Sequence, residues 1–171
     1  MTLSAEWLIY RDLAIALAAG LLIGLERGWA MRGERRGSRV AGIRTFGLIA
    51  GMGGLVALIA QSLNMVLAAI LLAAMVTMLS VSYARTIHLP DGRSITNYVV
   101  ALSTLCLGLL AGSGHPAVAM AGAAIVAALL STRDRLHGFL RKLGSTDIKA
   151  AIRFAIIVLA VLPFLPDQAY G

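Results

Sequence analysis

The chain has 171 residues and a formal net charge of +7, and 59% of its residues are hydrophobic while only 13% are charged. Soluble domains are about 45–50% apolar and roughly 25% charged, so this composition excludes an ordinary soluble fold and predicts an integral membrane protein. The basic residues stand between apolar segments without interleaved aromatic residues, which argues against a nucleic acid and makes membrane lipid the expected partner.

Apolar segments of about 20 residues predict helices that cross a bilayer. In chain order the candidates cover 7–26, 43–61, 64–84, 96–113, 115–131 and 148–165. The predicted fold class is therefore all-α, a polytopic transmembrane helical bundle with about six spans.

Lys and Arg gather in every second connection between these segments. The connections that follow the first, third and fifth segments are basic, whereas those around 61–64 and 112–116 carry no formal positive charge. Cytoplasmic loops of membrane proteins are enriched in Lys and Arg. The pattern predicts basic loops in the cytoplasm and both termini outside.

Glycines recur four residues apart on several segments, and such pairs let membrane helices approach closely. The pairs are Gly20 and Gly24, Gly47 and Gly51, and Gly108 and Gly112. They predict close packing inside the bundle, and they also suit the interface of a homodimer. We expect a homo-oligomer, with contacts to other membrane proteins as a further use of these faces.

Ionisable side chains within a membrane segment are costly and are functional candidates by default. Asp12 and Glu26 fall within roughly 60–100° of Arg27 around the first helix but lie roughly 21 Å apart along it. They cannot form one acid pair. They mark either two ends of one polar track or the two membrane interfaces.

Glu26 stands at the C-terminal end of its helix, where the macrodipole disfavours an acid. Arg44 begins the next segment, so we predict a Glu26–Arg44 ion pair that joins the first two helices, with a part in ion handling as the alternative. Thr45 is predicted to bond across helices or to its own backbone. Asn97, near the start of the fourth segment, predicts either a contact between helices or a place on an ion pathway.

Catalytic signatures are absent from the sequence: it has no HExxH, GxSxG or P-loop motif. The one cysteine, Cys106, lies in an apolar run, and His115 has no partner at metal-ligand spacing. We therefore expect no enzyme activity and no resident cofactor. Mg²⁺ would enter as a substrate or ligand that keeps part of its water, with ligands that the sequence does not define.

A two-part motif within residues 20–45 resembles the MgtC/SapB membrane family. Its two parts are Gly20-Leu-Leu-Ile-Gly24-Leu-Glu26-Arg27 and, after a basic loop, Ala41-Gly-Ile-Arg44-Thr45. The resemblance is strongest over 20–54 and implies that Glu26, Arg27, Arg44 and Thr45 are the motif residues. At Asn97 the resemblance leads us to expect an acid, so a proton-coupled role for that position is not supported.

Residues 114–117 and 161–167 resemble one branch of that family, in which a second membrane half follows the first. The expected organisation is an MgtC-like transmembrane domain over 1–145 and, over 146–171, a further helix that begins the second half. The resemblance implies a bacterial or archaeal inner-membrane protein of magnesium or other cation homeostasis or transport. It also implies an alternative: a regulatory protein that binds other membrane proteins, such as the ATP synthase, without transporting anything.

Overall fold

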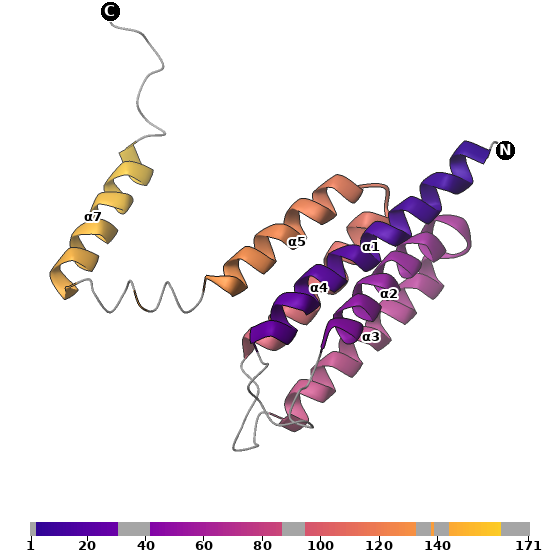
Figure 1. The fold of residues 1–171 in the computed structure, drawn as a ribbon, viewed down its shortest axis with the longest axis horizontal. Helices are drawn as coiled ribbons and strands as arrows, with labels where there is room; N and C mark the ends of the chain where they lie inside the picture. Colours follow the sequence, from indigo (N-terminus) through magenta and orange to yellow (C-terminus); the bar gives the residue numbers. More distant parts are fainter. Residues whose placement is uncertain (1–2, 31–41, 87–94, 133–137, 139–143, 162–171) are drawn as a thin grey trace, which may run out of the picture. The chain divides into compact units, whose positions relative to one another are not determined.

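A computed structural model describes residues 3–30, 42–86, 95–132, 138 and 144–161. Six helices lie in these ranges, in the order α1 (Leu3–Ala30), α2 (Ile43–Ser62), α3 (Met65–Thr86), α4 (Ile95–Gly112), α5 (Pro116–Ser131) and α7 (Ser145–Val161) (Figure 1). The chain divides into two compact units, Met1–Ser131 with the first five helices and Thr132–Gly171 with α7.

The predicted all-helical fold is confirmed, and in the described residues four of the helices, α1 to α4, are long and apolar enough to cross a membrane. Helix α5 is apolar but has only 16 residues, and α7 has 17. Both are shorter than the roughly 20 residues of an average span. Helix α1 is longer than the apolar segment that predicted it, because its backbone ladder continues through the charged residues at both ends.

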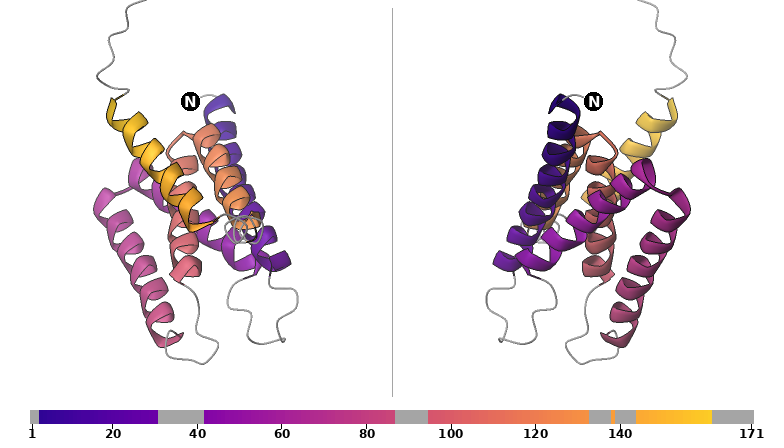
Figure 2. Two further views of the ribbon diagram at one scale, coloured as in Figure 1. Left: turned by 90° about the vertical axis from the view of Figure 1, so that its left-hand side faces the viewer. Right: turned by 90° about the vertical axis from the view of Figure 1, so that its right-hand side faces the viewer.

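The core of the first unit lies where α1, α2 and α4 meet, and α5 covers α1 and α4 (Figures 1 and 2). Its largest fully buried apolar side chains are Ile23, Phe46 and Leu105, one from each of the three helices. Ala16 and Ala19 of α1 have no exposed surface at all. Small residues beside a few large ones bring the backbones together, as is usual in membrane bundles.

Glycines set the closest approach between α1 and α2. A Cβ atom on Gly20 would lie 2.9 Å from the Cα of Gly47 and 2.7 Å from the Cβ of Ala50, and it would also meet the carbonyl oxygen of Phe46. A Cβ on Gly24 would lie 2.7 Å from the Cα of Ile43. These backbone contacts leave no room for a larger residue.

The contact between α2 and α4 is built in the same way. A Cβ on Gly108 would meet the carbonyl oxygen of Ala50 and would lie 2.7 Å from its carbonyl carbon. A Cβ on Gly112 would meet the carbonyl oxygen of Gly54 and would lie 2.8 Å from its Cα. The α2 helix therefore carries glycine-dependent contacts on two sides, with α1 and with α4.

Helix α3 lies at the edge of this unit, and among the described helices it packs on α2 and α4 (Figure 2). Only 11% of its membrane-spanning part is buried, against 44% for α2. Large apolar side chains such as Val66, Ile70 and Met78 are 60–68% exposed along it. This face of α3 is open to lipid or to another protein.

The link between α2 and α3 is short, and its polar backbone groups are bonded. The amides of Leu63 and Asn64 both donate to the carbonyl oxygen of Ile59, at 2.9 and 3.0 Å. The side-chain oxygen of Asn64 accepts from the amides of Val66 and Leu67, at 2.8 and 3.1 Å. Asn64 thus caps the first turn of α3.

The link between α4 and α5 ends α4 with a Schellman motif. The amide of His115 donates to the carbonyl oxygen of Leu110 at 3.0 Å, and that of Gly114 donates to Ala111 at 3.1 Å. Gly114 has a φ of +84°, the left-handed conformation that this motif requires and that glycine adopts without strain. Pro116 then begins α5, where the missing amide costs nothing.

Candidate functional site

The motif residues Glu26 and Arg27 lie near the C-terminal end of α1. Arg27 is only 7% exposed, and it shares a helix face with Gly20 and Gly24, which contact α2. Glu26 is half-buried, and its Oε2 atom is buried without a hydrogen-bond partner in the part of the chain that the structure describes. A buried acceptor without a partner is costly, which marks this carboxyl group as the first functional candidate.

The predicted ion pair between Glu26 and Arg44 is wrong. Arg44 is exposed at the first turn of α2, and the described residues contain no ion pair between it and Glu26. The reason is the rotation of α1: Gly24 faces α2, and position 26 lies about 160° around the helix from position 24. Thr45 is also exposed, and no bond joins it to another helix within the described ranges.

Asn97 is half-buried in the first turn of α4, at the same end of the unit, and its side chain makes no hydrogen bond within the described ranges. Its neighbour Tyr98 carries the polar contact instead, since the hydroxyls of Tyr98 and Ser80 lie 2.7 Å apart. The rings of Tyr98 and Tyr83 are stacked with centroids 5.1 Å apart. Tyr98 thus makes both a polar and an aromatic contact with α3.

The basic connections predicted to be cytoplasmic fall largely on 31–41, 87–94, 133–137 and 139–143, which lie outside the described residues. His115 is exposed in the α4–α5 link, and Cys106 is exposed on α4. No group of three or more His, Cys, Asp or Glu residues that could hold a metal occurs in the described ranges.

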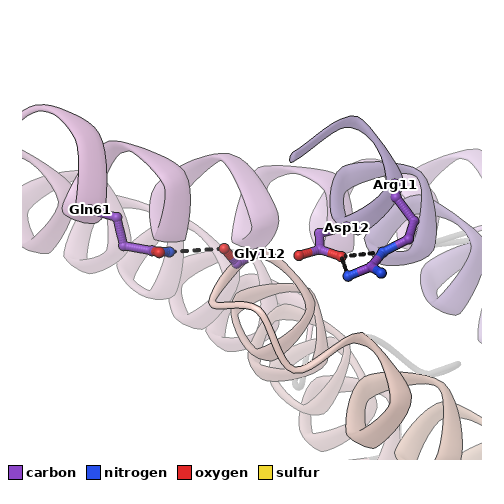
Figure 3. A network of polar contacts seen from close by, with 4 residues as sticks. All are labelled: Arg11, Asp12, Gln61 and Gly112. Atoms are coloured by element: carbon purple, nitrogen blue, oxygen red, sulfur yellow. Dashed lines mark hydrogen bonds and ion pairs between the residues drawn. The ribbon is translucent and has the colours of Figure 1, made fainter. Parts of the chain in front are cut away.

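A second polar group occupies the opposite end of α1. Asp12 is only 8% exposed, and its Oδ1 atom accepts from Nε of Arg11 at 2.9 Å and from Nη2 at 2.8 Å (Figure 3). The Arg11 side chain is 44% exposed, whereas that of Asp12 is 12% exposed. The carboxylate is thus held inside the protein while its cation partner reaches the surface.

Gln61 joins α2 to α4 beside Asp12. Its Nε2 atom donates to the carbonyl oxygens of Ala57, at 3.1 Å, and Gly112, at 2.9 Å (Figure 3). From the sequence, 61–64 was interpreted only as an uncharged link, and the role of Gln61 was not predicted. The signal that could have identified it is a glutamine at the end of an apolar segment, because a side-chain amide there can satisfy terminal carbonyl groups of a neighbouring helix.

The length and apolar character of α1 to α4 define a multi-pass membrane protein with ionisable groups at both ends of its first helix. The chain belongs to the MgtC family, whose model matches residues 13–139. The resemblance found in the two-part motif within residues 20–45 is thereby confirmed. No curated protein and no solved structure matches the chain.

Proposed function

We propose that this MgtC-family protein handles a cation, chiefly magnesium, at the cytoplasmic membrane, without enzyme activity. The observation that carries the proposal is the half-buried Glu26, whose Oε2 atom is buried with no hydrogen-bond partner within the described ranges. Ionisable groups inside membrane helices are rare, and they commonly mark ion or proton pathways.

The second support is the distribution of acids along α1. Asp12 and Glu26 lie within about 40° of each other around the helix axis and about 21 Å apart along it. One side of α1 therefore carries a carboxyl group near each membrane surface. This arrangement suits a path for a cation along α1, with Glu26 near the mouth on the side of the arginine-rich connection.

The membrane topology is part of the proposal. We infer that the basic connections face the cytoplasm, because Lys and Arg are enriched in cytoplasmic loops. Helices α5 and α7 are then expected to cross the membrane as well, which gives six spans. Labelling of a single cysteine placed at His115, in a protein whose Cys106 is replaced by Ala, tests the outer location of the α4–α5 link.

The test of function is Mg²⁺ entry into liposomes that contain the purified protein and an internal magnesium-sensitive dye. We expect flux in the wild type and at least a tenfold loss in Glu26→Gln, which removes the charge but keeps the shape. Glu6→Gln is the matched control, since Glu6 lies on the same helix in an exposed first turn. Equal flux and stability in Glu26→Gln and wild type would exclude this role.

A regulatory role without flux is the second proposal, and the exposed apolar face of α3 favours it. Gly24 and Gly51 were expected to hold a partner, but both are buried at the α1–α2 contact. The α3 face is the better candidate for a partner such as the ATP synthase or a second copy in a homodimer. Loss of a co-purified partner on Ile70→Asn would support it, and light scattering of the wild type would test the homodimer.

A further inference from the structure

A small cavity opens beside Asp12, at the end of the first unit where α1 begins and α2 and α4 end. Its volume is about 160 Å³, which is room for several water molecules. Leu8, Leu13 and Leu58 form part of its apolar wall. Asp12, Gln61 and Ser62 are the residues with polar side chains in its lining.

The polar side chains of this cavity have oxygen atoms that the hydrogen bonds described above do not use. Both bonds from Arg11 go to Oδ1 of Asp12, and Oδ2 lies on the side of the carboxylate that faces Gly112 (Figure 3). Gln61 uses its NH₂ group on two backbone carbonyl oxygens, so its Oε1 atom remains an acceptor. Ser62 also lines the cavity, and its side chain carries a third oxygen. Such a wall is complementary to a cation.

The ion pair at the edge of the cavity is asymmetric. The Arg11 side chain is 44% exposed and Asp12 only 12%, so the guanidinium can move into water or among lipid headgroups while the carboxylate stays in place. A divalent cation carries twice the charge of the guanidinium and competes with it for the same carboxylate.

We propose that this cavity binds one partly hydrated divalent cation and that Arg11 is a tethered counter-ion which the cation displaces from Asp12. Mg²⁺ keeps several of its waters in proteins and is held through one or two carboxylates, which matches a single acid in a cavity with room for water. The inference rests on the proposed cation-handling function and adds a binding site at the end of α1 opposite Glu26.

The test is Mn²⁺ binding to the full chain in detergent, measured by the electron paramagnetic resonance signal of free Mn²⁺ and by competition with Mg²⁺. We expect one site in the wild type, loss of that site in Asp12→Asn, and binding about fivefold tighter in Arg11→Gln, because a partly exposed competing cation has been removed. Glu6→Gln is the matched control and is expected to bind as the wild type does.

The opposite effects of Asp12→Asn and Arg11→Gln separate a cation site from a merely structural ion pair, in which both changes would act through stability alone. Unchanged or weaker Mn²⁺ binding in Arg11→Gln would overturn the proposal. Ser62→Asp is a second variant at an exposed residue of the same wall, in case Asp12→Asn does not fold. It is expected to bind Mn²⁺ more tightly, and unchanged binding would also overturn the proposal.

Mg²⁺ flux through the same preparations distinguishes the two proposals. Mn²⁺ binding with the expected variant pattern but without flux would support the site and contradict the transport form of the proposed function. Flux in the wild type without Mn²⁺ binding at Asp12 would support the function and overturn the site.

Discussion

Helices α2 and α3 are consecutive, apolar and of similar length, yet they are held in different ways. Glycines of α1 and α4 meet the backbone of α2, and 44% of the membrane-spanning part of α2 is buried. Helix α3 is the more hydrophobic of the two, but only 11% of its spanning part is buried. Greater hydrophobicity therefore does not mean deeper burial in this protein.

The difference in burial between α2 and α3 follows from the lipid that surrounds the helices. Lipid tails are as apolar as leucine, so there is little hydrophobic driving force for a membrane helix to exchange contacts with lipid for contacts with protein. Close approach of backbones, which small residues allow, is what holds α2 in the centre.

Gly108→Leu is expected to prevent folding of the first unit, because any side chain at this position meets the backbone of Ala50. Overpacking of a well-packed core costs about 1–3 kcal/mol, and a leucine against backbone atoms should exceed that range. The loss of folded protein is measured as the fall in the monodisperse fraction after size-exclusion chromatography in detergent. Ala74→Leu on the exposed side of α3 is the control, and equal yields of the two variants would contradict the comparison.

Gly20→Ala and Gly51→Ala add the same methyl group to the same helix pair but should differ in cost. At Gly20 the new Cβ meets backbone atoms of α2, whereas at Gly51 it meets only the side chain of Leu17, with Cδ2 at 2.8 Å. Because Leu17 can rotate away, we expect a loss of about 1–3 kcal/mol for Gly20→Ala and less than about 1 kcal/mol for Gly51→Ala. Denaturant unfolding in micelles measures both, and a reversed order would refute the backbone-contact explanation.

The smallest effect is expected where α3 meets α4. Ser80 donates its one hydroxyl hydrogen to the carbonyl oxygen of Val76 at 2.7 Å, so the hydroxyl of Tyr98 is the donor to Ser80. A double-mutant cycle of Ser80→Ala and Tyr98→Phe should give a coupling of about 0.6 kcal/mol, typical of hydrogen bonds between membrane helices. A coupling above about 2 kcal/mol would mean that α3 is held more firmly than its exposure indicates.

The positions of the helices followed from the sequence because runs of apolar residues between charged or turn-forming ones are a strong signal. Four of the six predicted segments begin and end within two residues of the observed helices, whereas α1 extends four residues beyond its segment at each end and α7 begins three and ends four residues before its segment. The number of spans is less well determined by sequence, since α5 and α7 are shorter than an average span. Helix length depends on caps and turns, and hydropathy does not report these.

The candidate site was only partly predictable. Asp12 and Glu26 stood out because acids are rare in apolar segments, whereas the partner assigned to Glu26 was wrong. That assignment used closeness along the chain, but the rotation of α1 is fixed by Gly20 and Gly24 against α2. The Gln61 bridge and the cavity beside Asp12 depend on three helices meeting in space, which no single segment of sequence reports.

The compact link between α2 and α3 has a consequence for biosynthesis. Its amides are already bonded to Ile59, and Asn64 caps the next helix, so few polar groups need water when the tip moves through the hydrocarbon layer. We expect the two helices to leave the translocon together as a hairpin as soon as both have been synthesised. The hydrophobicity of α3 would then help carry α2, with its many glycines, into the bilayer.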